Sequence, residues 1–154
     1  MPIRPARVTE GAALTALSIR SKAHWGYDAA FMDRAAPHLA IPPDLLALGR
    51  VWVSTGSDDR PLGVMAFGLP DATGLSDLTL LFIDPPAIGQ GHGAALLRHA
   101  LTTARSDGAR RLQVLSDPHA LGFYLGQGAQ QIGTAPSEAI PGRRLPLLEW
   151  TLPR

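Results

Sequence analysis

The stretch Ile88-Gly89-Gln90-Gly91-His92-Gly93-Ala94 places three glycines at alternate positions between two patterned segments. The residues before it, 80–83, are Leu-Leu-Phe-Ile, as in a strand that is buried on both faces. The residues after it, to about 106, repeat apolar side chains at helical spacing. A strand that runs through a glycine-rich turn into a helix exposes unpaired backbone amides at the positive end of the helix dipole. Such a turn suits a pyrophosphate group.

Two other nucleotide-binding motifs compete for the same glycines. A P-loop ends in Gly-Lys-Ser/Thr, but Gly93-Ala94-Ala95 supplies neither the lysine nor the hydroxyl that binds Mg²⁺. The dinucleotide fingerprint fits more closely, because Gly89-x-Gly91-x-x-Ala94 has its spacing and Asp117 follows at the distance of a ribose-binding acid. A doubly wound sheet would need more strand–helix units than the fewer than 40 residues beyond Asp117 can form. A tight turn that binds no ligand is the structural alternative.

The rest of the chain predicts short elements separated by turns. Helices are expected at 11–21 and 27–38, and the adjacent Pro42 and Pro43 should end helical structure. Strands are expected at 3–8, 50–55, 62–69, 75–83, 112–115, 129–134 and 147–152, with helices at 91–106 and 118–127. The order is then βααβββαβαββ. This order predicts a mixed α/β fold in one domain that spans residues 1–154.

Composition excludes several classes of function. The net charge is +1 and the basic residues are scattered, which argues against a nucleic-acid partner. The chain has no cysteine, and its five histidines show no metal-ligand spacing, so no metal is predicted. Neither a signal peptide nor a run of about 20 apolar residues is present, so we expect a soluble cytoplasmic protein and no membrane partner.

A longer series of residues around the glycine turn carries a resemblance to a known family. The turn and its helix are followed by a strand, Leu112-Gln113-Val114-Leu115, then by Pro118-His119-Ala120-Leu121-Gly122-Phe123-Tyr124 and by Gly128-Ala129. From Leu78 to about Ala129 this series resembles the acetyl-coenzyme A (acetyl-CoA) binding core of the Gcn5-related N-acetyltransferase (GNAT) superfamily. The resemblance implies the GNAT fold, an α/β (α+β) domain whose mixed, mostly antiparallel sheet has about seven strands with helices on both faces.

The resemblance also implies how the coenzyme is bound. The strand that contains Leu81 should splay from its parallel neighbour near Leu112, so that the pantetheine arm enters the gap. Tyr124 should lie near the coenzyme sulfur and donate a proton to the departing thiolate. Two positions depart from the family pattern: Ile88 replaces an Arg or Gln, and His119 replaces a common Asn. The expected coenzyme-binding residues are Leu81, Phe82, Ile83, Ile88, Gly89, Gln90, Gly91, His92, Gly93, Ala94, His119 and Tyr124.

Acetylation of an amine also requires a base and an acceptor site. Asp77, near the start of the central strand, is the better candidate for the base, and Asp84 before two prolines resembles a turn-former. The segment from Ser21 to Tyr27, Ser-Lys-Ala-His-Trp-Gly-Tyr, resembles one found in a bacterial branch of the superfamily whose acceptor is unknown. His24, Trp25 and Tyr27 are therefore expected to contact substrate, with His24 as a proton carrier, and Arg143 to pair with a carboxylate of the acceptor. A packed loop is the alternative for this segment.

The sequence thus predicts an acyl-CoA-dependent N-acetyltransferase that transfers an acetyl group from acetyl-CoA to a primary amine of a small metabolite. Two alternatives stay open: acetylation of a protein N-terminus or lysine, and a regulator that binds acyl-CoA without catalysis. A homodimer is also left open. No residue of the sequence names the acceptor.

Overall fold

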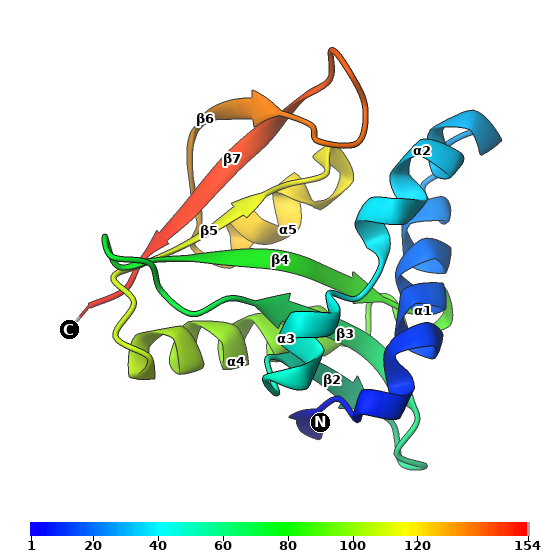
Figure 1. The fold of residues 1–154 in the computed structure, drawn as a ribbon, viewed down its shortest axis with the longest axis horizontal. Helices are drawn as coiled ribbons and strands as arrows, with labels where there is room; N and C mark the ends of the chain where they lie inside the picture. Colours follow the sequence, from blue (N-terminus) through cyan, green and yellow to red (C-terminus); the bar gives the residue numbers. More distant parts are fainter. Residues whose placement is uncertain (154) are drawn as a thin grey trace.

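The computed structural model describes residues 1–153. A seven-stranded sheet forms its centre, in the order β1-β2-β3-β4-β5-β7-β6 (Figure 1). The strands are β1 (Ile3–Pro5), β2 (Val51–Thr55), β3 (Pro61–Phe67), β4 (Leu75–Ile83), β5 (Arg111–Leu115), β6 (Gln130–Pro136) and β7 (Arg144–Thr151). Neighbouring strands run antiparallel except β4 and β5, which are parallel. The predicted mixed, mostly antiparallel sheet is confirmed.

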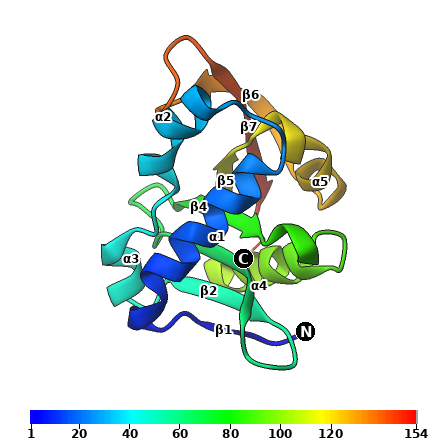
Figure 2. The ribbon, with the colours of Figure 1, turned by 90° about the vertical axis from the view of Figure 1, so that its right-hand side faces the viewer.

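Helices cover both faces of this sheet (Figure 2). They are α1 (Gly11–Ala23), α2 (Ala29–Leu39), α3 (Pro43–Ala47), α4 (His92–Ser106) and α5 (Leu121–Gly126), with short 3-10 turns η1 (Val8–Glu10), η2 (Pro85–Ala87) and η3 (Pro118–Ala120). Leu14 and Leu17 of α1 join one apolar cluster, and Leu96 and Leu97 of α4 join another. The two helices therefore lie on opposite faces.

The alternation of side chains along β2 assigns its residues to these two clusters. Val51 and Val53 are fully buried beneath α1, while Trp52 points to the cluster that contains α4. Because the side chains of a strand point to alternate faces, β2 packs against α1 on one face of the sheet and against the cluster of α4 on the other. The C-terminal end of α1 and the N-terminal end of α4 are thereby fixed near the same part of β4.

The parallel pair β4 and β5 stays together over only three residues of each strand. Leu75, Ser76 and Asp77 pair with Arg111, Leu112 and Gln113. Beyond this point β5 turns away from β4 (Figure 1). On its other side β4 remains paired to β3, with a bulge at which Thr79 is the extra residue between Leu78 and Leu80. The open strand edges leave a gap near the middle of the sheet.

The structure corrects one expectation about the helices. Pro42 and Pro43 were expected only to end helical structure, but Pro42 caps α3 and Pro43 is its first residue. Proline suits this position because its fixed φ matches a helix and its missing amide would have had no partner. None of the helices within residues 1–153 is long and apolar enough to cross a membrane.

Candidate active site

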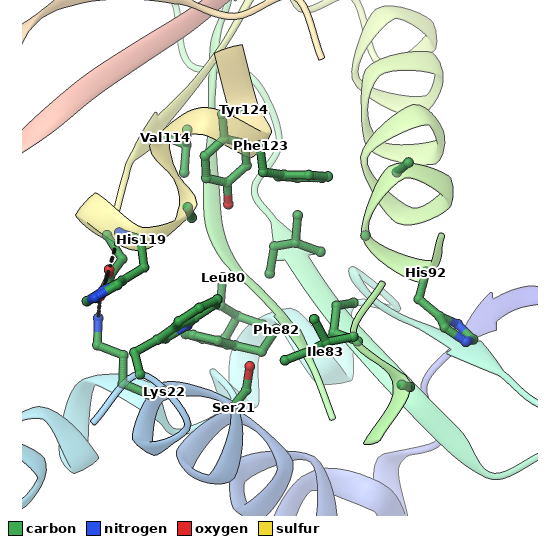
Figure 3. A pocket seen from close by; sticks show the side chains of 18 of the residues that line it. Ser21, Lys22, Leu80, Phe82, Ile83, His92, Val114, His119, Phe123 and Tyr124 are labelled. Carbon is green, nitrogen blue, oxygen red and sulfur yellow. Dashed lines mark hydrogen bonds and ion pairs between the residues drawn. The ribbon is translucent and has the colours of Figure 1, made fainter. Parts of the chain in front are cut away.

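A cavity of about 500 Å³ lies where β4 and β5 separate (Figure 3). Its walls are mostly apolar and come from Thr79–Ile83 of β4, from the end of β5 and from α5. The C-terminal end of α1 and the glycine turn before α4 complete it. We call this space the donor cleft. Its size and apolar lining are typical of a small-molecule site.

The glycine turn forms one end of the donor cleft. Gly89 has a φ of 85° and Gly91 a φ of 94°, in the left-handed region that glycine adopts without strain. The helical hydrogen bonds of α4 begin with the bond from the Ala95 amide to the Gly91 carbonyl. The amides of residues 92–94 precede that bond, and no side chain caps Gly91. The turn thus presents backbone donors of the kind that hold a phosphate.

The side chains of the turn contribute less than its main chain. His92 is buried and lines the cleft, but its ring points away from the cavity, with Nδ1 2.9 Å from Ser54 Oγ (Figure 3). Desolvation lowers the pKa of His92, and the positive N-terminus lowers it further. Ile88 lines the cleft and is 38% exposed, whereas Gln90 is not among the lining residues. An anion at this turn would therefore be held mainly by backbone amides.

Replacing Gly91 by alanine is expected to weaken acetyl-CoA binding about tenfold. An alanine in the left-handed conformation costs roughly 1 to 2 kcal/mol. The free protein relieves this strain by rearranging the turn, and the ligand must restore it, which raises the Kd. Calorimetry with acetyl-CoA measures the change. The control is Gly122→Ala on α5, where an added Cβ meets nothing within 4 Å and φ is not positive; an equal effect there would contradict this role of the turn.

Tyr124 projects from α5 into the donor cleft, where its hydroxyl points toward the gap between the strands (Figure 3). The ring is 5% exposed and makes edge contacts with Phe123 and Trp150. Burial raises the pKa of the Tyr124 hydroxyl well above its usual range, and the charge of Asp117 raises it further. The hydroxyl therefore stays protonated at neutral pH and is available as a donor.

A second cavity, of about 310 Å³, adjoins the donor cleft. It lies between α2, β4 and the segment 137–143 that joins β6 and β7. The two cavities have four lining residues in common, which are Lys22, Thr79, Leu115 and Leu145. We call this second space the acceptor cavity. Two reactants held in the two spaces would meet at the gap between β4 and β5.

The two candidate bases lie in different places. Asp77 lines the acceptor cavity, whereas Asp84 lines neither cavity and forms an ion pair of 3.2 Å with Arg20. Asp77 remains accessible to solvent, yet desolvation raises its pKa, and the nearby carboxylates of Asp71 and Glu138 raise it further. A carboxylate with a raised pKa is a better proton acceptor than an ordinary one.

Asp117 gathers four side chains at the junction of the two cavities, those of Lys22, Tyr27, His119 and Arg143. Its carboxylate accepts hydrogen bonds from Lys22 Nζ at 2.5 Å and from the Tyr27 hydroxyl at 2.8 Å. It also accepts from the His119 backbone amide at 2.8 Å, and Arg143 lies 3.9 Å away. Burial alone would raise the pKa of Asp117, but these donors, Lys22 foremost, hold it well below its usual range. We call these residues the Asp117 cluster.

Sequence reasoning missed Lys22 and Asp117 as members of the site. The one available signal was position, since Asp117 follows the end of β5, where the strands separate, and caps η3. Lys22 lies in the segment from Ser21 to Tyr27, in which substrate contact was predicted only for His24, Trp25 and Tyr27.

Of the three residues in segment 21–27 that were predicted to contact substrate, only Trp25 lines a cavity. Trp25 lines the donor cleft and stacks on His119 at 5.1 Å between ring centroids. Tyr27 lines neither cavity, and its ring stacks on Phe31 at 3.9 Å. His24 also lines neither cavity; it is exposed and lies edge-on to Trp25. The structure therefore brings Trp25 and His119 to the cleft and leaves His24 outside it.

Within residues 1–153, no group of three or more His, Asp or Glu side chains is placed to hold a metal ion.

Comparisons with known proteins agree with this architecture. The sequence profile of the acetyltransferase (GNAT) family matches residues 18–128. The chain is 34% identical, over 110 residues, to the peptidyl-lysine N-acetyltransferase YjaB of Salmonella typhimurium, a match that covers 71% of this chain and 70% of that protein.

Two solved structures share the fold at low sequence identity. A GCN5-related N-acetyltransferase from Rhodopseudomonas palustris superposes with a TM-score of 0.77 at 19% identity and covers 98% of this chain and 95% of that one. PaiA N-acetyltransferase from Thermoplasma acidophilum, in complex with coenzyme A, gives 0.76 at 14% identity over 97% and 98% of the two chains. With the profile match and the YjaB relative, these comparisons show that the chain belongs to the acetyltransferase (GNAT) family.

Proposed function

We propose that the protein transfers the acetyl group of acetyl-CoA to a primary amine of a small metabolite. One observation supports this above the others: two cavities meet at the gap between β4 and β5, with Tyr124 in one and Asp77 in the other. The donor cleft offers backbone amides at its glycine turn and unpaired strand edges beyond Asp77. These groups fit the pyrophosphate and the amide-containing arm of the coenzyme.

Each side chain then has a defined part in the reaction. The amine nitrogen attacks the carbonyl carbon of the thioester, and the carbon–sulfur bond breaks. Asp77, directly or through water, takes the proton that the amine loses, and Tyr124 donates to the thiolate that leaves. Two pockets that share a wall also hold the reactants close together, which lowers the entropy cost of the encounter.

Two measurements test this proposal. Calorimetry should show binding of acetyl-CoA, and no binding at millimolar ligand would overturn every version of the proposal. A screen of primary amines, followed through the released thiol, should then find acetylation. Binding of acetyl-CoA with no acetylated amine of any class would favour a regulator in place of an enzyme.

The Asp77→Asn substitution tests the base. We expect kcat/KM near neutral pH to fall about tenfold, less than for a fully enclosed base because solvent water reaches this position. In the wild type, kcat/KM should rise with pH through the raised pKa of Asp77, and the variant should lose this rise. The comparison variant is Asp84→Asn, whose carboxylate lies outside both cavities. Equal pH profiles for the wild type and Asp77→Asn would remove Asp77 from this part.

A lysine side chain of a protein is the second candidate acceptor. The name of the 34% identical relative favours it. Acetylation of lysine within peptides, at a higher kcat/KM than any free amine, would select this alternative.

A further inference from the structure

The Asp117 cluster contains more positive charge than negative. Its charged side chains come from three separate parts of the chain: Lys22 lies in the last turn of α1, Asp117 follows β5, and Arg143 precedes β7. Asp117 is the one carboxylate of the described residues within 4 Å of either cation. The cluster thus sets two basic side chains, Lys22 and Arg143, beside one carboxylate, so one positive charge has no partner in the cluster.

These cations are held in a largely buried position. The side chains of Lys22, Asp117 and Arg143 are 13%, 14% and 20% exposed. Arg143 packs over the rings of Tyr27 and Phe31, at 5.3 and 4.9 Å from their centroids, and donates to the Tyr27 hydroxyl at 2.9 Å. Burying a charge without a counter-charge is costly. A fixed guanidinium with spare donors and excess positive charge points to an anionic ligand.

The excess charge faces the acceptor cavity. Both Lys22 and Arg143 line that cavity, and Arg143 does not line the donor cleft. In Figure 3, Lys22 and the glycine turn that carries His92 lie at opposite ends of the donor cleft. In the proposed function the phosphates of acetyl-CoA bind at the glycine turn, while its pantetheine arm and acetyl group are uncharged. The donor therefore supplies no anion where Lys22 and Arg143 lie.

The other charged groups of the cavity do not cancel this excess. His38, Asp77 and Glu138 also line the acceptor cavity. Neither Asp77 nor Glu138 forms an ion pair with Lys22 or Arg143 among residues 1–153. The pKa of Asp77 is raised rather than lowered, with Asp71 and Glu138 as its charged neighbours, so Asp77 does not compensate the cations. The cavity has a positive part at its junction with the donor cleft and a negative part around Asp77.

We propose that the acceptor is an amine that also carries a carboxylate, as an amino acid does, and that Arg143 and Lys22 bind this carboxylate. The inference rests on the proposed acetyl transfer. The guanidinium of Arg143 matches the two oxygens of a carboxylate, and Lys22 adds a second charge beside it. When its carboxylate is bound in this way, the amine of the same molecule is oriented toward the gap between β4 and β5, on the side of the acceptor cavity that Asp77 lines. Lys22 and Arg143 are specificity-determining residues in this arrangement.

The test compares matched acceptors on the wild-type protein. The probes are free amino acids, their carboxamides and the corresponding amines that lack the carboxylate. For the amino acids that are acetylated, kcat/KM should exceed that of the matched carboxamide and amine at least tenfold. Losing a hydrogen bond between charged groups weakens binding by about this factor. Phosphonate analogues of the same amino acids show whether the site accepts other anions; they should be weaker than the carboxylates.

Two neighbouring arginines provide the variants. Arg143→Met should reduce the preference for the carboxylate at least tenfold, bringing the ratio of kcat/KM between acid and amine close to one. Arg144→Met is the control, because Arg144 is exposed and bonds to Thr134 on β6; it should keep the wild-type ratio. If Arg143→Met does not fold, the wild-type comparison still decides the matter.

The outcomes separate this inference from the proposed function. Carboxamides or amines acetylated as efficiently as the acids overturn the carboxylate site and leave acetyl transfer standing. No acetylation of any amino acid by a protein that binds acetyl-CoA also overturns it. Failure to bind acetyl-CoA overturns the proposed function itself.

Discussion

The Tyr124→Phe substitution is expected to lower kcat about 100-fold while it changes the Kd for acetyl-CoA less than threefold. Proton donation by a positioned side chain contributes a factor of this size. Phenylalanine keeps the ring and its edge contacts with Phe123 and Trp150, and only the hydroxyl is lost. Because the hydroxyl has no hydrogen-bond partner among the described residues, its removal leaves no other polar group unpaired.

Three measurements on this variant separate chemistry from structure. Single-turnover kinetics report the chemical step, calorimetry reports coenzyme affinity, and the thermal midpoint should stay within about 2 °C of the wild type. A kcat equal to that of the wild type would show that the thiolate leaves without help from Tyr124. A parallel loss of affinity and kcat would instead assign Tyr124 to binding.

The backbone geometry of the glycine turn, of α4 and of β4 could be predicted because its signals are local in the sequence. The glycines at 89 and 91 are needed where the backbone takes a positive φ, and the helix that follows repeats its apolar residues at a regular spacing. The bounds of β4 were predicted as Leu75 to Ile83, since its apolar run is flanked by turn-forming residues on both sides. Local geometry and residue type agree at these positions, so the sequence alone is informative.

The contacts of the Asp117 cluster could not be predicted in the same way because they are tertiary. Lys22 and Asp117 are 95 positions apart, and Tyr27 and Arg143 are 116 apart. No spacing rule joins residues at such separations; they meet because α1 packs on the sheet to which β5 and β7 belong. Arg143 was expected to pair with an acceptor carboxylate, but its contact with Tyr27 and its place beside Asp117 were not foreseen. The short helix α3 was missed for a different reason, since a proline pair signals a helix start as well as a stop.

The Asp117→Asn substitution should lower the free energy of unfolding by about 3 kcal/mol, because it leaves Lys22 and Arg143 largely buried beside a neutral side chain. For a chain of this size that corresponds to a fall in Tm of roughly 6 to 12 °C. Asparagine also turns an amide donor toward groups that are themselves donors, so fewer of their hydrogen bonds survive. The control is Asp33→Asn, an exposed position on α2, which should change Tm by less than about 2 °C.

The difference in unfolding free energy between the wild type and Asp117→Asn should depend on pH, which gives an independent check that the charge of Asp117 stabilises the protein. The pKa of Asp117 in the folded protein is lowered from its usual value of 3.8, so the folded state favours the ionised form. Its contribution to stability is complete above that value and is lost as the pH falls below it. The difference in unfolding free energy between the wild type and Asp117→Asn should therefore be constant from about pH 7 to pH 5 and should shrink below about pH 4.

The same variant connects the stability of the cluster to catalysis. Asp117 holds Lys22 at the junction of the two cavities and caps the turn that leads into α5, which carries Tyr124. Its loss should raise the KM for the acceptor more than the Kd for acetyl-CoA, since the glycine turn lies at the other end of the donor cleft. Measuring both constants below the Tm of the variant distinguishes this from partial unfolding, which would weaken both alike. A difference in stability that persists unchanged down to pH 3 would mean that shape, and not the charge of Asp117, stabilises the junction.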